Sequence, residues 1–163
     1  MADKILNFTW EAVNNRVAKV GAGAYLTTPT PTPVTTTPTR LLGTFTNVEA
    51  EGFEIDGATG KLKYNPTDGL ARTFVLIYSG NVEGAGSNDI VGVTIEVVRD
   101  SVASIIPGSS TETICRLSAS PYPFSRGVPY TYEVGDLIEI QVYGDSSFTL
   151  IMAEFTTNLF KFY

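Results

Sequence analysis

A tract rich in threonine and proline, from Thr27 to Thr39, is the feature that most restricts how this chain can fold. Its prolines fix the backbone angle φ and lack an N–H donor, and the threonines between them offer no continuous apolar face. The composition therefore predicts an extended, polyproline-like linker over residues 27–40. This linker would separate an N-terminal docking segment, residues 1–26, from one compact domain, residues 41–163.

Residues 41–163 have the pattern of short β-strands separated by turns. Apolar side chains alternate with others over residues 90–98 and 137–143. Residues 72–79 are apolar at both parities in their middle, which is typical of a central strand covered on both sides. Turn residues recur roughly every 8 to 12 positions, and we expect loops over residues 80–89 and 120–129. The pattern predicts an all-β domain, an antiparallel sandwich or jelly roll.

The charge of the chain argues against a nucleic-acid partner. Eleven Lys and Arg against 17 Asp and Glu give a formal net charge of −6, and the cations are scattered singly. Such a surface would repel a phosphate backbone. No apolar run approaches the roughly 20 residues that a membrane-spanning helix needs. We therefore expect neither nucleic acid nor a membrane as a partner.

The residue types that carry most catalysis are absent or isolated. The chain has no histidine, which excludes Ser-His-Asp and Cys-His nucleophiles and most zinc chemistry. Carboxylates two positions apart, such as Glu54 and Asp56, are typical of a solvated strand face, and the turn aspartates lack EF-hand spacing. The single cysteine, Cys115, is expected to be a small buried apolar residue. The sequence predicts no enzyme activity and no cofactor or metal.

The N-terminus begins with eight residues that contain one lysine and no apolar stretch of signal-peptide length. This favours a protein made in a cytoplasm. Trp10 lies before the Thr/Pro tract, outside the expected sandwich, where it is either a lid on the base of the domain or an anchor for a partner surface.

Several short motifs occur in a fixed order: Phe53-x-Ile55, Gly57-x-x-Gly60, Leu62-x-Tyr64, Arg72-x-Phe74-x-x-x-Tyr78, Val93-x-Ile95, the run from Val134 to Ile140, and Phe148-x-Leu150. This order resembles that of the trimeric tumour-necrosis-factor-like and complement-like jelly rolls. It is most similar to the versions that tailed phages carry as capsid decoration, cement or head-fibre proteins. The resemblance covers about residues 41–163. Its motifs are structural, so no functional residue of the family transfers to a position of this chain.

The resemblance implies an antiparallel jelly-roll sandwich that forms a homotrimer on the outer capsid surface of a virion. The partners would be the major capsid protein and further copies of the same chain. A trimer would also bury the aromatic surplus that one small sandwich cannot cover. We expect the trimer interface to contain Tyr130, Tyr132, Tyr143, Phe160, Phe162 and Tyr163. The alternative for each of these residues is a place in the core of its own subunit.

The N-terminal segment carries the apolar side chains that would dock on the capsid: Phe8, Trp10, Val13, Val17 and Tyr25. Aromatic anchors dominate the energy of many interfaces. Because the Thr/Pro tract would decouple this segment from the sandwich, removal of residues 1–40 is expected to leave the thermal midpoint nearly unchanged.

A second function is compatible with the same fold. A receptor- or carbohydrate-binding module of a phage fibre or lectin would use exposed aromatic side chains in loops such as residues 120–129. Its partner would be a host-surface glycan. A capsid clamp binds through residues 1–40 and the base of the trimer, whereas a receptor module binds through loops at the opposite tip.

Overall fold

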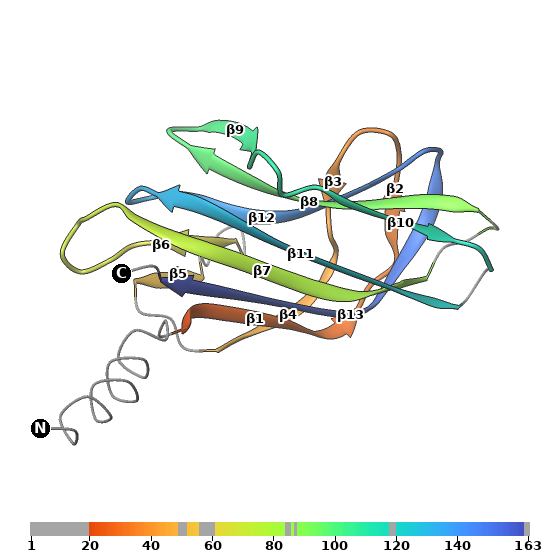
Figure 1. Ribbon diagram of the computed structural model, residues 1–163, viewed down its shortest axis with the longest axis horizontal. Helices are drawn as coiled ribbons and strands as arrows, with labels where there is room; N and C mark the ends of the chain where they lie inside the picture. Colours follow the sequence, from red (N-terminus) through yellow and green to blue (C-terminus); the bar gives the residue numbers. More distant parts are fainter. Residues whose placement is uncertain are drawn as a thin grey trace, which may run out of the picture.

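A computed structural model describes residues 20–48, 52–55, 61–83, 86, 88–117 and 120–161, of which residues 20–24, 47, 48, 55 and 161 are described by their backbone alone. Every strand in these ranges pairs antiparallel with its neighbours. The strands form two sheets packed face to face (Figure 1). The predicted all-β antiparallel sandwich is therefore confirmed.

The first sheet contains six strands. Its order is β11 (Pro121–Tyr132), β7 (Arg72–Glu83), β13 (Phe148–Lys161), β1 (Val20–Pro29) and β4 (Gly43–Val48), and β2 (Thr32–Val34) also pairs with β13. β7 and β13 are the long central strands, and β11 and β4 lie at the two edges of this order.

The second sheet contains seven strands. Its order is β10 (Thr111–Cys115), β8 (Asp89–Arg99), β12 (Leu137–Gly144), β6 (Leu62–Tyr64) and β5 (Phe53–Ile55). In addition, β3 (Thr39–Arg40) pairs with β12, and β9 (Val102–Ile105) pairs with β8.

The core lies between the sheets because alternate residues of each strand point inward. Phe74, Leu76 and Tyr78 of β7 are buried against Ile95 and its neighbours in β8. Near one end of the sandwich, the rings of Phe53, Tyr64, Phe74 and Tyr132 form a cluster whose centroids lie 4.8 to 6.2 Å apart. Such edge and tilted ring contacts add to the energy of simple apolar burial.

The prediction of an extended linker is wrong, because residues 20–40 are part of the sandwich. β1 is hydrogen-bonded on both sides, to β13 and to β4. Within the Thr/Pro tract itself, Thr32 and Val34 are each only 1% exposed, and the Thr32 hydroxyl accepts a hydrogen bond from the Leu42 backbone N–H at 3.1 Å. Pro33 is tolerated because β2 pairs with β13 alone, so its missing N–H can face away from the ladder.

Long strands also replace part of one expected loop and most of another. β7 extends through Glu83, four residues into the predicted loop over residues 80–89. The predicted loop over residues 120–129 is most of β11, which pairs with β7 along its whole length. β11 is an edge strand, and the prolines at positions 121, 123 and 129 are therefore compatible with its ladder.

Candidate interaction surface

The outward residues at the centre of the first sheet form a surface without charge. Cross-strand pairing places Ser125, Ser79, Thr156 and Tyr25 in one row across β11, β7, β13 and β1. The rows beside it contain Gly127, Ile77 and Asn158, and then Pro129, Val75 and Phe160. We call these ten residues the uncharged face. None of them carries a formal charge, and all are exposed or half-buried.

The uncharged face contains apolar side chains that one subunit leaves open. Ile77 is 43% exposed and Tyr25 is 42% exposed, while Val75 and Phe160 are half-buried. The apolar pattern of β7 at both parities predicts a strand covered on both sides, and the described residues cover only its inward side. Contiguous exposed apolar residues on a sheet face are typical of an association surface.

The outer face of the second sheet has the opposite character. Glu139 of β12 forms ion pairs with Arg40 (Nε to Oε1, 3.2 Å) and Lys61 (Nζ to Oε2, 3.0 Å). Glu96 lies directly opposite Glu139 on β8. Partial burial, reinforced by the charge of Glu139, raises the pKa of Glu96. Charge is therefore concentrated on one face of the sandwich and absent from the centre of the other.

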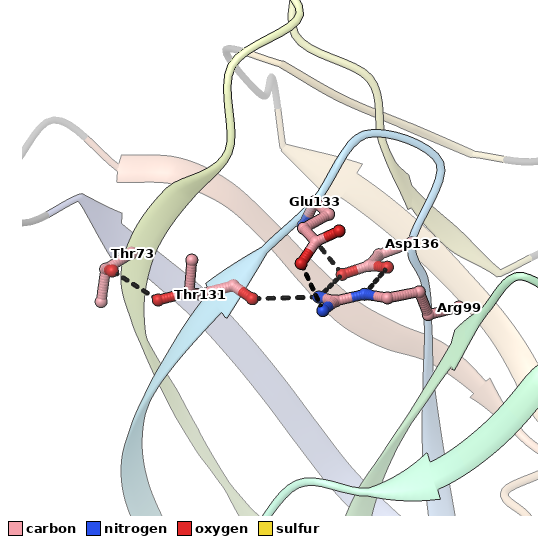
Figure 2. A network of polar contacts seen from close by, with 5 residues as sticks. All are labelled: Thr73, Arg99, Thr131, Glu133 and Asp136. Carbon is pink, nitrogen blue, oxygen red and sulfur yellow. Dashed lines mark hydrogen bonds and ion pairs between the residues drawn. The ribbon is translucent and has the colours of Figure 1, made fainter.

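An arginine network closes one corner of the molecule (Figure 2). Arg99, at the end of β8, donates from Nε and Nη2 to the two carboxylate oxygens of Asp136, at 2.8 and 2.6 Å. It also donates to Glu133 at 2.7 Å and to the Thr131 backbone carbonyl at 3.1 Å. The hydrogen bonds with Asp136 raise the pKa of Arg99 above its usual value. Since Asp136 is 1% exposed, this bidentate pair holds the turn between β11 and β12 against β8.

The aromatic residues expected at a trimer interface do not share one surface. Tyr132 is fully buried in the core of its own subunit, so its assignment to an interface is wrong. Its inward position follows from the alternation of β11, which places it opposite Arg72 and beside Phe53 and Phe74. Tyr130 is half-buried, with its ring 4.9 Å from that of Tyr132.

The other interface candidates are divided between the two sheets. Tyr143 lies on the outer face of the second sheet, where its hydroxyl donates to Glu112 at 3.0 Å and its ring covers Gly92. Phe160 lies on the uncharged face. Phe162 and Tyr163 lie outside the described residues.

The docking residues are largely beyond what the structure describes. Phe8, Trp10, Val13 and Val17 lie outside the described residues. Tyr25 belongs to β1 and lies on the uncharged face, in register with Thr156 of β13. Its place in a sheet differs from the expected docking segment over residues 1–26.

The aromatic residues of 120–129 are not presented from a loop. Phe124 is buried in the core, and the half-buried Tyr122 accepts a hydrogen bond at its hydroxyl from the Leu117 backbone N–H at 2.7 Å. Both are held by β11, so the loop expected for glycan binding is not present in this form.

A thiol, a metal site or a membrane span in the described ranges could also carry a function. Cys115 is fully buried, as predicted. In the described ranges, no three His, Cys, Asp or Glu side chains gather as a metal site would require. The same ranges contain no helix that is long and apolar enough to cross a membrane.

Comparison with known proteins identifies the fold. No family model matches the chain, and no curated protein matches its sequence. Among solved structures, it is similar to murine APRIL at pH 5.0, with a TM-score of 0.56 and 12% identity over 87% of this chain and 99% of that one. The structure of murine APRIL at pH 8.5 gives a TM-score of 0.52 and 12% identity over 85% and 98%.

A third solved structure, Eiger TNF from S. frugiperda, matches with a TM-score of 0.58 and 9% identity over 87% of this chain and 93% of that one. The chain thus has the tumour-necrosis-factor-like jelly-roll fold, which confirms that part of the resemblance. At these identities the likeness concerns the fold alone.

The residues predicted from the sequence for an interface are aromatic, and they do not include the aliphatic residues of the uncharged face. Val75 and Ile77 are absent from the predicted set, although the apolar character of residues 72–79 at both parities was the signal that marks them. The pairing partners of β7 decide which side faces the core, and those partners come from β11 and β13, at distant positions in the chain.

Proposed function

We propose that this chain is a structural protein that forms a homotrimer through the uncharged face and decorates the outer surface of a phage capsid. The observation that carries the proposal is the outward side of β7, where the exposed Ile77 lies next to the half-buried Val75 and Phe160. In a threefold arrangement, a second copy of the chain would cover this side, so that β7 would be covered on both sides as its sequence pattern predicts.

The distribution of charge supports the choice of face. Burial of uncharged side chains costs little desolvation, whereas burial of the Arg40, Lys61 and Glu139 group on the second sheet would be expensive. The uncharged face also contains Tyr25, and tyrosine is enriched at interfaces because its ring buries area while its hydroxyl finds a polar partner.

The path of the chain supports attachment to the capsid through one end of the sandwich. Val20, where β1 begins, is paired with Phe160, near the end of β13 (Figure 1). Residues 1–19 therefore join the sandwich at the end where β13 finishes. Phe8, Trp10, Val13 and Val17 belong to this segment, and in our proposal they bind the major capsid protein.

The decoration role is tested with particles made from the genome that encodes this chain. We expect purified particles to contain the 17.6 kDa chain in multiples of three copies. Particles made without the gene should assemble but rupture at a lower temperature, and added protein should restore their resistance. If the chain is missing from purified particles, or if its loss leaves rupture unchanged, the decoration role is wrong.

The matched variant for attachment replaces Trp10 with alanine. Trp10→Ala should weaken binding to particles without changing the oligomeric state, because in our proposal it lies outside the trimer interface. If the original protein and Trp10→Ala bind particles equally well, residues 1–19 do not dock on the capsid, and the trimer proposal is unaffected.

A further inference from the structure

A cavity lies inside each subunit, between the two sheets. Its volume is about 300 Å³. Leu76 and Leu159 of the first sheet and Ile95 and Ile138 of the second line it, and all four are buried. The space is about twice that of an engineered apolar cavity of roughly 150 Å³ that holds benzene. A packed protein interior rarely leaves so large a void without an occupant.

The rim of the cavity is formed where β12 passes from one partner strand to another. β12 pairs with β3 at Gln141 and Val142 and with β6 at Leu137 and Ile138. Between these two short pairings lie Glu139 and Ile140, which line the cavity together with Arg40 and Lys61. The rim is therefore charged, whereas the interior is apolar.

The charged groups at the rim are unequally paired. Arg40 and Lys61 both pair with the carboxylate of Glu139. Lys61 also lies within the electrostatic influence of Glu96, which is opposite Glu139 on β8. Arg40 uses only its Nε in this pair, and its side chain is 46% exposed. In the part of the chain that the structure describes, its two terminal nitrogens have no partner, and they present the fork that binds a carboxylate with two hydrogen bonds.

Among the described residues, one polar side chain that lines the cavity is buried without a hydrogen-bond partner. Thr157 lines the cavity at an inward position of β13 and is 7% exposed. Its hydroxyl has no hydrogen-bond partner among the described residues. Buried polar groups are almost always paired, so the sandwich does not complete its own packing at this place.

We propose that this cavity binds a small amphipathic carboxylate, with its apolar chain between the sheets and its carboxylate on Arg40. The apolar walls gain from the removal of chain surface from water, and the unused terminal nitrogens of Arg40 favour a carboxylate head over a neutral one. A chain of about ten carbons suits the volume, judged from the cavity that holds benzene. The site lies within one subunit and does not depend on the trimer.

The test uses decanoate below its micelle concentration, with the full-length protein and methyl-resolved NMR. We expect saturable binding of one decanoate per subunit that shifts the methyl signals of Ile95 and Ile138 and leaves those of Ile77 in place. Decanol, which has the same chain without the charge, should bind at least about fivefold more weakly. Absence of saturable decanoate binding, or shifts confined to the uncharged face, would overturn the proposal.

Two variants and a control locate the head and the chain. Arg40→Gln should weaken decanoate binding at least about fivefold, whereas Lys63→Gln, a cation on β6 that pairs with Glu54 outside the cavity, should stay within about twofold of the original protein. Ile140→Trp narrows the rim at a half-buried position and should also weaken binding. An Arg40→Gln protein that folds and binds decanoate with unchanged affinity contradicts the assigned head site.

Discussion

Arg99 is the single side chain on which one corner of the sandwich depends. In Arg99→Gln, the carboxylate of Asp136 stays buried but loses its bidentate partner and keeps one hydrogen bond, from the Glu133 backbone N–H. Loss of one member of a buried ion pair costs about 3 kcal/mol. We expect the thermal midpoint to fall by roughly 10 °C in a calorimetric scan.

The control for this variant is Arg126→Gln. Arg126 is exposed and donates from Nε to the Gly108 backbone carbonyl, without a buried carboxylate as partner. Its loss should cost less than about 1 kcal/mol. Equal midpoints for the two variants would show that the Asp136 pair does not hold the turn.

Glu96 makes stability depend on pH. Because burial and Glu139 raise its pKa in the folded state above that of the unfolded chain, the folded protein is favoured while Glu96 is protonated, and this advantage is lost as the pH rises through the folded-state pKa. Glu96→Gln should therefore raise the free energy of unfolding at pH 7 by up to about 1 kcal/mol, the scale of a cross-strand pair.

The pH profile distinguishes removal of the Glu96 carboxylate from a gain in stability that does not depend on its ionisation. The difference between Glu96→Gln and the original protein should shrink as the pH falls through the folded-state pKa of Glu96, and it should disappear below about 4.3, where the unfolded-state carboxyl is neutral as well. Ser104→Ala, at an exposed residue of β9 whose side chain does not titrate in this range, should show no such profile. Urea unfolding at pH 7 and pH 4 measures both, and a gain that persists unchanged at pH 4 would contradict the explanation.

Among the elements, β1 differs most from what the sequence predicts, because residues expected in a docking segment and a linker form a strand inside a sheet. It lies between β13 and β4, so its removal exposes two ladders and the inward side of the first sheet. We expect a chain of residues 41–163 to lose cooperative unfolding, whereas residues 20–163, which retain every described strand, should keep it. Circular dichroism during heating measures both, and a 41–163 chain with the original midpoint would restore the linker interpretation.

The sequence allowed the strands with clear alternation to be predicted, and it failed where composition and pairing disagree. Residues 90–98 and 137–143 lie within β8 and β12, because one side of each run is apolar. The Thr/Pro tract was misread because an edge strand with one partner has the same composition as an extended linker. β1 could not be placed from local pattern, since its partner β13 lies at the other end of the chain.

The candidate surface was likewise predictable where local pattern defines it and not where distant pairing does. The exposed apolar side of β7 was visible in the sequence as apolar residues at both parities, whereas Tyr132 was assigned to an interface because aromatic content alone does not tell core from surface. Only the register of β11 on β7 separates Tyr132, which points inward, from Thr131, which points outward.

At the scale of the whole molecule, a charge placed at the centre of the uncharged face should prevent association. Ile77 is 43% exposed in the single chain, so Ile77→Asp should leave the subunit folded while a buried, unpaired carboxylate disfavours the trimer. Val102→Asp makes a similar change on β9, at a residue that is 67% exposed, and should leave the oligomeric state unaltered. Size-exclusion chromatography compares the two variants. A monomeric Val102→Asp protein would show that the interface lies on the second sheet and not on the uncharged face.

The mass of the full-length protein in solution, measured by light scattering at micromolar concentration, decides whether the chain forms a trimer. We expect about 53 kDa, three times the 17.6 kDa of one chain, and 17.6 kDa for Ile77→Asp. A mass of 17.6 kDa for the unmodified protein would contradict this expectation, because the open side of β7 would then be stable in water without a second copy.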